Sequence, residues 1–353
     1  MRVLHVIATG PGDLMGVTTA LRGIAQAQAA IGMDVCIVAL GAWPEVWREG
    51  LHVVNSSARD LPGALHRLAG VESVIHTHVP WRMPALAPIY MRRLRRRFVH
   101  SPHGSLAPAA MNVRSRRKTV AWRTLFRRAL QAHDLLLVNS PAERDDVRAA
   151  GVTRPVVCVP HPLADRGPTR PVRRDRATVA FLGRIHPIKG VLELVQAWRA
   201  LGPEVNGWTL DIAGPVEDAD YMREVRAAAA GGDDVRFFPP LFGEDRWRYL
   251  ANATIVAVPS WAENFCYVVA EALSVGTPVL TTTGVPWPAI DTMDLGWRGP
   301  GTAAALRGLL SQAVESGPEA LAAKGERGRA YVEAELRPGA VAIAYERAYR
   351  LIH

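Results

Sequence analysis

Two glutamates lie between two short apolar segments in the second half of the chain. Residues 253–258 and 277–282 are apolar and β-branched, which predicts two buried strands. Between them we expect a loop that carries Glu263 and a helix that carries Glu271. Amides at the start of a helix can hold a phosphate. The two carboxylates could then accept hydrogen bonds from hydroxyls on either side of that phosphate, as an acidic residue does with ribose in dinucleotide folds.

A second segment offers positive charge for the same kind of ligand. Residues 178–182 predict a strand, and Gly183 and Arg184 follow it directly. Lys189 and Gly190 come next, where a helix is expected to begin. Two cations of different reach near a helix start suit a diphosphate. For the glutamate pair, spacing alone also fits a loop cap and an exposed helical residue.

Both segments resemble the donor-binding motifs of a known enzyme family. The run from Pro259 to Leu280 contains Glu, seven residues, Glu and then Gly-x-Pro-Val. It is similar to the nucleotide-sugar motif of retaining glycosyltransferases of the two-domain GT-B type, family 4 in particular. Residues 183–190 resemble the Gly-Arg…Lys-Gly motif of that family, and residues 283–297 are similar to a bacterial surface-polysaccharide branch. The resemblance implies an α/β fold in which two Rossmann-like domains face each other across a cleft.

The resemblance also implies roles for particular residues. Arg184 and Lys189 would neutralise the leaving nucleoside diphosphate. Pro-His-Gly at residues 102–104 resembles the family position whose histidine faces the donor sugar. The predicted catalytic residues are therefore His103, Arg184, Lys189 and Glu263. The predicted donor-binding residues are Gly16, Gly183, Leu241, Asn264, Phe265, Cys266 and Glu271.

Three positions depart from the family pattern. Cys266 stands where the family usually has glycine, and a side chain there leaves less room for the backbone to approach a phosphate. Gly16 alone remains of a glycine pair in the loop after the strand predicted at residues 3–7. Pro240 stands where glycine is common in the loop that holds the nucleoside base. The loop over residues 8–16 lacks the full dinucleotide fingerprint and also fits a plain turn.

Length and composition indicate two globular domains. The chain has 353 residues, of which 49% are hydrophobic and 21% charged, as in a soluble protein. We expect an N-terminal acceptor-side domain over residues 1–166, with residues 338–353 packing back on it as a helix. A linker rich in Pro, Gly and Arg at 165–175 leads to a nucleotide-sugar-binding domain over 167–337. No apolar run approaches the roughly 18 residues of a membrane span.

The cysteines indicate a reducing compartment. Cys36, Cys158 and Cys266 lie in apolar surroundings without a pairing pattern or metal-ligand spacing. We therefore expect all three to be buried and the protein to be cytoplasmic.

Histidines and aspartates offer two apparent metal motifs that we do not interpret as such. His76, His78, His100 and His103 have no accompanying carboxylate or cysteine, so we expect strand-end residues and no metal site. Asp-Ala-Asp at residues 218–220 mimics a metal motif of other glycosyltransferases and is interpreted as a helix cap.

A further cap is expected earlier in the chain, at the start of a helix. Ser140, with Glu143 three residues on, predicts a capping box.

Positive charge gathers in one part of the predicted N-terminal domain. The net charge is +9, and no acidic residue lies between Glu72 and Asp134. Basic residues are frequent from Arg92 to Arg128 and must attract a polyanion or an anionic surface. Apolar residues among them, over 105–130, predict either an amphipathic helix on an anionic membrane or a solvated helix packed inward. Family members that act on lipid-linked acceptors favour a peripheral location on the inner membrane face.

These features together predict a retaining, metal-independent hexosyltransferase without a cofactor. It would move a hexose from a nucleoside-diphosphate sugar to a hydroxyl of a saccharide acceptor, lipid-linked, in bacterial polysaccharide or lipopolysaccharide biosynthesis. Two alternatives stay open: another GT-B enzyme, such as a nucleotide-sugar epimerase or a phosphorylase, and a non-enzymic polyanion binder that uses the basic stretch. The density of motifs in the second domain argues against the binder, and no nucleic-acid partner is expected.

Overall fold

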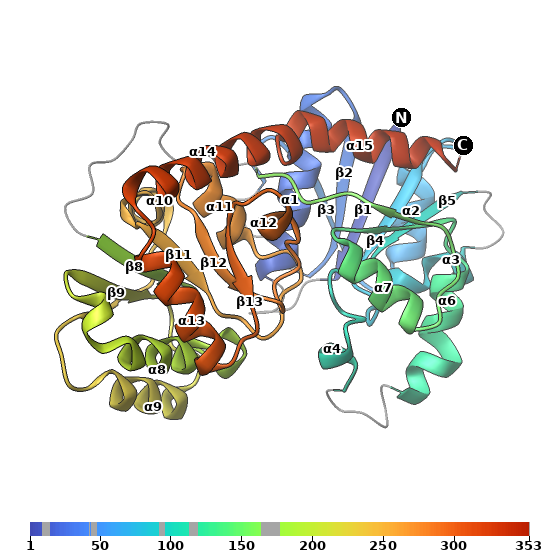
Figure 1. Cartoon of the computed structure of the whole chain (residues 1–353). Coiled ribbons are helices and arrows are strands. Elements are labelled where there is room, and N and C mark those ends of the chain that lie inside the picture. The colour runs from blue at the N-terminus through green and yellow to red at the C-terminus, as the bar shows by residue number, and fades with distance from the viewer. Residues whose placement is uncertain are drawn as a thin grey trace. The chain divides into compact units, whose positions relative to one another are not determined.

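A computed structural model describes most of the chain. The described residues are 1–8, 15–41, 43, 48–91, 96–112, 119–163 and 177–352. They form two compact units: unit 1 comprises Met1–Ala164 and Glu335–His353, and unit 2 comprises Asp165–Ala334. Each unit contains one parallel sheet with helices packed on it (Figure 1). Most of the first glycine-containing loop, the linker, and the basic residues at 92–95 and 113–118 lie outside the described residues.

The sheet of unit 1 has seven parallel strands in the order β3-β2-β1-β4-β5-β6-β7. The strands are β1 Arg2–Ala8, β2 Asp34–Leu40, β3 His52–Ser56, β4 Val74–His78, β5 Arg97–Ser101, β6 Leu135–Val138 and β7 Val156–Cys158. The order reverses direction between β1 and β4, which is the Rossmann arrangement. Ligands bind such sheets at the carboxyl ends of the strands near this reversal.

Helices of unit 1 come from both ends of the chain. They are α1 Met15–Ala30, α2 Leu61–Leu68, α3 Ala87–Tyr90, α4 Pro108–Asn112, α6 Arg127–Gln131, α7 Pro141–Ala149 and α15 Pro338–Arg350, with a π-helical turn at Trp122–Phe126 before α6. Leu21 and Ile24 of α1 share a buried core with Tyr345 and Tyr349 of α15. The last helix of the chain therefore belongs to the core of the first unit.

Ser140 is confirmed as the N-cap of α7, but the Glu143 carboxylate accepts the reciprocal bond of the predicted capping box from the amide of Asn139 instead of that of Ser140. The Ser140 hydroxyl accepts a hydrogen bond from the amide of Glu143 at 3.2 Å. Glu143 is buried, and its carboxylate accepts from the amides of Asn139 at 2.8 Å and Gly104 at 2.6 Å. The cap thus also fastens the loop after β5, which carries His103.

The sheet of unit 2 has six parallel strands in the order β10-β9-β8-β11-β12-β13. The strands are β8 Ala177–Leu182, β9 Trp208–Ala213, β10 Val235–Phe238, β11 Ile255–Val258, β12 Val279–Thr282 and β13 Gly296–Gly299. The expected strands around the glutamate pair are β11 and β12. Here the order reverses between β8 and β11, so the segments with Lys189 and Glu263 follow neighbouring strands.

Seven α-helices are described in unit 2: α8 Val191–Leu201, α9 Ala219–Ala229, α10 Gly243–Asn252, α11 Tyr267–Ser274, α12 Ala289–Thr292, α13 Ala303–Val314 and α14 Pro318–Glu335. The Asp218 side chain accepts hydrogen bonds from the amides of Asp220 at 3.0 Å and Tyr221 at 2.9 Å. The interpretation of this motif as a helix cap is therefore confirmed. Within the described part of the chain, no helix combines the length and apolar character needed to cross a bilayer.

The cysteines correct one expectation. Cys36 is buried in the sheet of unit 1, but Cys158 is exposed and Cys266 is partly exposed. The prediction that all three are buried was wrong for Cys158 because β7 is the edge strand of its sheet, and the apolar run around it covers only one side.

Seven of the eleven histidines of the chain are buried in unit 1, namely His5, His76, His78, His100, His103, His133 and His161. His5 pairs in register with His76 on the neighbouring strand, so these two side chains share one face of the sheet with His78. Thr77 and His100 share the opposite face, where both contact His133. Burial lowers the pKa of every one of these histidines, to about 4 for His5 and about 3 for His103 and His133.

We therefore expect unit 1 to be acid-labile. Each of these histidines is neutral in the folded state and takes up a proton near pH 6.5 when unfolded, so stability is fully present above pH 6.5 and falls as pH decreases. Each adds a slope of about 1.4 kcal/mol per pH unit. Burial raises the pKa of Glu143 to about 7, so this carboxyl group binds its proton more readily in the folded state than in the unfolded state. It therefore adds a slope of the opposite sign, but it is one group against seven histidines.

Urea unfolding between pH 7.5 and pH 5 measures this slope. His133→Asn should reduce the slope of the free energy of unfolding against pH by about 1.4 kcal/mol per pH unit, the contribution of one proton. His66→Asn removes an exposed histidine and is the control. A free energy of unfolding that is independent of pH across this range would contradict the expectation.

Candidate functional site

A cavity of about 180 Å³ lies in unit 2 at the carboxyl ends of β8 and β11. It is lined by Phe181, Leu182, Gly183, Arg184, Lys189, Val258, Ser260, Glu263, Cys266, Tyr267 and Val268. Five predicted site residues therefore meet here although they are far apart in sequence. The place is the one where the strand order reverses, as expected for a ligand site in an open parallel sheet.

An ion pair joins the two loops that form this cavity. The Lys189 ammonium lies 2.5 Å from Oε1 of Glu263, and the side chains are 17% and 13% exposed. The Ser260 hydroxyl donates to the same oxygen at 2.7 Å. The amide of Trp261 also donates to the carbonyl of Ile188 at 2.9 Å. Lys189 is thus fixed at the cavity wall by its ion pair with Glu263.

Glycines allow the loops around the cavity to approach each other. Gly190 has φ +66°, and a Cβ there would lie 2.2 Å from the carbonyl oxygen of Pro259. Gly214 has φ +149°, and a Cβ there would lie 1.7 Å from the carbonyl oxygen of Gly183. Both positions require glycine because a side chain would collide with backbone that has no room to move.

Arg184 reaches the cavity from its exposed side. Its guanidinium lies 2.7 Å from the carboxylate of Glu217, and the Arg184 side chain is 54% exposed. An exposed ion pair of this kind is worth at most about 1 kcal/mol. The guanidinium can therefore exchange Glu217 for an anionic ligand at little cost.

Glu271 is buried beside the cavity and does not line it. Its carboxylate lies 3.0 Å from the guanidinium of Arg246 on α10. The alternative of an exposed helical residue is therefore wrong for Glu271. Arg246 was missed in the sequence because nothing in its local pattern on α10 distinguishes it from the exposed Arg248 nearby.

Cys266 occupies a backbone conformation that favours glycine. It is the N-cap of α11, with φ +64° and ψ +74°, in the left-handed region. The glycine that the family resemblance implies here would adopt this conformation without steric cost. Burial raises the pKa of the Cys266 thiol well above its usual range, so the group at the cavity wall is a neutral thiol.

Three further predicted donor-binding residues of unit 2, besides Glu271, lie outside the cavity lining. The Phe265 side chain is buried and packs on Trp287, with ring centroids 5.6 Å apart. Asn264 is partly exposed in the same loop, and Leu241 is partly exposed before α10. These positions can offer backbone groups or a rim, whereas the cavity wall itself is formed by other side chains.

The two predicted residues of unit 1 occupy different surroundings. Gly16 is exposed near the start of α1, with open space where a Cβ would be. His103 follows β5 with φ +52°, and its Nε2 lies 2.8 Å from Nδ1 of His78. The signal for a connection between His103 and other histidines was the position of His76 and His78 at the end of a neighbouring strand.

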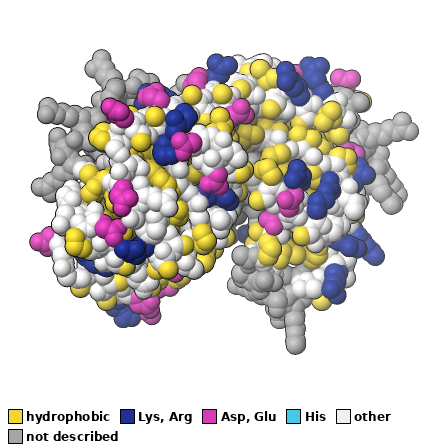
Figure 2. Space-filling model, viewed as in Figure 1, with side chains coloured by type: hydrophobic (Ala, Val, Ile, Leu, Met, Phe, Trp, Pro, Cys, Tyr) yellow, Lys and Arg dark blue, Asp and Glu magenta, His cyan; other side chains and the backbone are white. Residues whose placement is uncertain are grey.

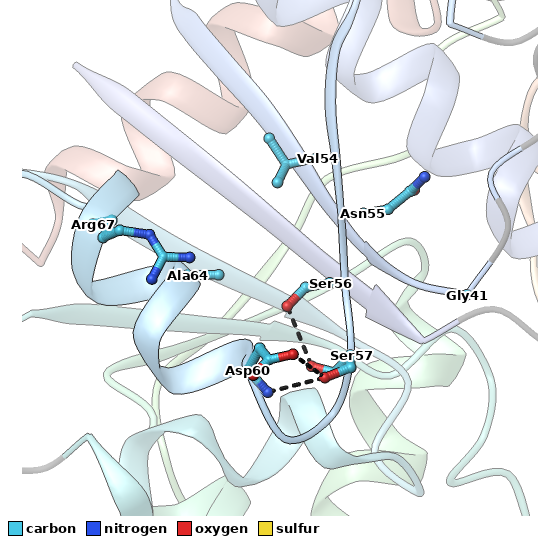
Figure 3. Close-up of a pocket in the computed structure, with 8 residues that line it drawn as sticks. All are labelled: Gly41, Val54, Asn55, Ser56, Ser57, Asp60, Ala64 and Arg67. Atoms are coloured by element: carbon cyan, nitrogen blue, oxygen red, sulfur yellow. Dashed lines mark hydrogen bonds between the residues drawn. The ribbon is translucent and has the colours of Figure 1, made fainter.

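Unit 1 also contains an open hollow of about 580 Å³ at the carboxyl ends of β2 and β3 (Figure 3). It is lined by Gly41, Val54, Asn55, Ser56, Ser57, Asp60, Ala64 and Arg67. The Ser57 hydroxyl donates to the Asp60 carboxylate at 2.6 Å, and Arg67 of α2 lies above them (Figure 3). Hydroxyl, amide, carboxylate and guanidinium groups thus surround one hollow.

One group of potential metal ligands occurs among the described residues. Nitrogen atoms of His5, His76 and His78 all lie within 4.8 Å of one another. Sequence reasoning considered His76 and His78 but not His5, which comes from β1. In this structure the nitrogens of all three are engaged in hydrogen bonds to protein groups.

Family models match both units. Residues 15–162 match the model described as "Glycosyl transferase 4-like domain", and residues 176–307 match "Glycosyl transferases group 1". The second match contains every residue of the cavity wall.

Relatives and solved structures agree with these matches. A D-inositol 3-phosphate glycosyltransferase of Nocardioides sp. is 34% identical over 43% of this chain, and the match spans only 39% of that protein. One from Corynebacterium urealyticum is 27% identical over 77% of this chain and 76% of its own length. Sucrose-phosphate synthase from Thermosynechococcus elongatus has a TM-score of 0.79 at 18% identity, covering 99% of this chain and 98% of that one. The Anabaena protein HepE with UDP and glucose has a TM-score of 0.78 at 16% identity, covering 99% and 100%.

The two Rossmann-like units and their structural neighbours define the GT-B fold. With matches to both family models, the chain belongs to the family 4 type of GT-B glycosyltransferases. The α/β GT-B fold class and the resemblance to family 4 predicted from the sequence are therefore confirmed, whereas the surface-polysaccharide branch stays a prediction.

The close approach at Gly190 generates a stability prediction. Gly190→Ala combines a left-handed φ with a backbone collision, and we expect it to lower the free energy of unfolding by about 2–4 kcal/mol. Gly308→Ala on α13 is the matched control because open space surrounds that position. It should be neutral or stabilising by up to about 1 kcal/mol. Equal urea midpoints for the two variants would refute the argument.

Proposed function

We propose that this glycosyltransferase transfers a hexose from a nucleoside-diphosphate sugar to an acceptor hydroxyl, with retention of configuration. The observation that carries the proposal is the cavity of unit 2, where Lys189 and Arg184 bring positive charge to the start of α11. The neighbouring structures of HepE contain UDP and UDP-glucose, which makes UDP the first nucleotide to test.

The charges suit stabilisation of the leaving group. As the bond between sugar and diphosphate breaks, negative charge grows on the diphosphate, and cations fixed nearby lower the energy of that state. Lys189 is held at 2.5 Å from Glu263, so a phosphate oxygen would share its ammonium without moving the loops. Arg184 would leave Glu217 to meet the second phosphate. These two cations and the α11 amides would supply the countercharge that a metal ion supplies elsewhere.

Glu271 and Glu263 would then flank the diphosphate. We propose that Glu271 accepts from ribose hydroxyls, a role supported by its fixed position beside Arg246. Glu263 would accept from hydroxyls of the transferred sugar, and His103 of unit 1 would orient another hydroxyl of the same sugar. Cys266, the N-cap of α11, places a thiol where the family resemblance implies glycine.

The acceptor is proposed to bind in the hollow of unit 1. Its hydroxyl, amide and carboxylate groups suit the hydroxyls of a saccharide or polyol, and Arg67 suits a phosphate on such a molecule. The names of the relatives, D-inositol 3-phosphate glycosyltransferases, support a phosphorylated polyol as a candidate beside a lipid-linked saccharide. A role in bacterial polysaccharide or lipopolysaccharide synthesis belongs to the second of these.

A membrane surface is a second proposal for unit 1. Among the described residues of the basic stretch, Arg123, Arg127 and Arg128 lie on one helical segment with Val120 and Leu125, which are exposed apolar residues. Figure 2 shows Lys and Arg side chains on the face of unit 1 that carries α6. This combination favours contact with anionic lipid.

Binding of UDP tests the donor site. UDP at about 100 times its dissociation constant should raise the free energy of unfolding by roughly 2.7 kcal/mol. We expect Lys189→Met and Arg184→Ala to weaken binding about tenfold to a hundredfold, the usual value of a charged hydrogen bond. Arg223→Ala on α9 is the control for Arg184 because it removes another exposed arginine that is paired with a carboxylate but does not line the cavity.

Glu271→Gln is preferable to alanine in the same titration, since it keeps a partner for Arg246. If no nucleoside diphosphate stabilises the wild type, the donor proposal fails. Release of UDP from UDP-sugar only when an acceptor is present separates a transferase from an epimerase or phosphorylase. A polyanion binder would instead show a steep salt dependence and no effect of these substitutions.

Steady-state kinetics test the acceptor hollow. Arg67→Ala and Asp60→Asn should raise the KM for the acceptor about tenfold while UDP binding to unit 2 stays unchanged. Arg59→Ala, an exposed arginine that does not line the hollow, is the control. An unchanged acceptor KM in both hollow variants would exclude this location.

A further inference from the structure

Histidines in unit 1 form a continuous chain of hydrogen bonds that ends at His103. Nε2 of His103 lies 2.8 Å from Nδ1 of His78, and Nε2 of His78 lies 3.0 Å from Nδ1 of His5. Nε2 of His5 lies 2.8 Å from the side-chain oxygen of Gln28. The chain thus passes from the loop after β5 through β4 and β1 to helix α1.

Burial makes the members of this chain neutral. His5, His78 and Gln28 are fully buried, and His103 is the most exposed member at 8%. Burial lowers the pKa of His5 to about 4 and of His103 to about 3, and it lowers the pKa of His78 well below its usual value. At neutral pH each ring therefore carries one N–H, so each of the three contacts receives one proton.

The amide of Gln28 then decides where every proton lies. Its oxygen faces His5 and can only accept, so the His5 proton is on Nε2 and Nδ1 of His5 is bare. That bare nitrogen must accept from Nε2–H of His78, and Nδ1 of His78 must accept from Nε2–H of His103. His103 is left with a lone pair on Nδ1.

The C-terminal helix fixes the orientation of that amide. The Gln28 NH2 group donates to the Tyr349 hydroxyl at 3.1 Å. The hydroxyl lies 2.8 Å from Nδ1 of His76, whose Nε2 lies 2.9 Å from the Ser101 hydroxyl. With Gln28 as donor to Tyr349, the hydroxyl donates to His76 and the whole network runs in one direction.

We propose that Gln28 is a positioning residue that holds His103 in its Nε2–H tautomer, so that Nδ1 accepts a hydrogen bond from a ligand hydroxyl. The ligand part rests on the proposed function, in which His103 meets a hydroxyl of the transferred sugar. In this tautomer His103 cannot donate to a leaving oxygen through Nδ1. It selects a sugar with a hydroxyl at the contacted position and disfavours an analogue with fluorine there.

Nitrogen NMR of the full chain with 15N-labelled histidine tests the tautomer without any ligand. At pH 7.5 we expect His5, His78 and His103 all to show Nε2 protonated and Nδ1 bare. In Gln28→Met, His103 should become a mixture of both tautomers. Gln26→Met, on the same helix and partly exposed, should leave the wild-type pattern. Nδ1–H on His103 in the wild type, as a reversed Gln28 amide would give, overturns the proposal, and so does an unchanged Gln28→Met spectrum.

Two additions keep the outcome decisive. If Gln28→Met does not fold, Tyr349→Phe removes the hydroxyl that orients the amide and should give the same mixture at His103. Treatment with EDTA should not alter the wild-type spectrum. A changed spectrum would mean that a metal ion on His5, His76 and His78, and not the chain of hydrogen bonds, sets the tautomers.

Kinetics then separate this proposal from the proposed function. If UDP-sugar is the donor, Gln28→Met should lower kcat/KM about threefold to tenfold, the range expected for one neutral hydrogen bond, with UDP binding unchanged. With a donor that carries fluorine in place of the contacted hydroxyl, kcat/KM should be the same for the wild type and Gln28→Met. If the NMR shows the expected tautomers but UDP does not bind, the role of Gln28 stands and the proposed donor site is refuted. If UDP binds but His103 carries its proton on Nδ1, the donor site stands and the role of Gln28 is refuted.

Discussion

The Lys189–Glu263 ion pair is the contact on which the site in unit 2 depends. It joins the loops after two neighbouring strands, and it is possible only because Gly190 lets those loops approach. Removing either partner would leave a poorly solvated charge in the wall, which costs more than the pair contributes. The pair therefore fixes geometry more than it stabilises the fold, and it keeps a cation ready for an anionic ligand.

The sequence pattern was sufficient to predict those parts of the fold and the site whose residues lie close together along the chain. The strands around Glu263 and Glu271, the Gly-Arg…Lys-Gly segment and two helix caps are each set by residues within one or two turns of each other. Parallel topology then places the loops after neighbouring strands side by side, which is why Arg184, Lys189 and Glu263 meet.

Contacts between distant elements could not be predicted in this way. Arg246 pairs with Glu271 because α10 packs beside α11. The sequence pattern of α10 does not predict which of its arginines makes this contact. His5 joins His76 and His78 because β1 pairs with β4 in one particular register, which only the assembled sheet defines. Cys158 was expected to be buried because its neighbours are apolar, whereas its exposure follows from the edge position of β7.

The contribution of α15 to unit 1 bears on the order of folding during synthesis. Domains generally fold as units while the chain leaves the ribosome, N-terminal first. Here the core of unit 1 includes Tyr345 and Tyr349, which are translated after all of unit 2. The first half of the chain must therefore remain incomplete while the second half forms, and the Gln28 amide receives Tyr349, the acceptor of its NH2 group, only when helix α15 is released. Unit 1 begins first and is finished last.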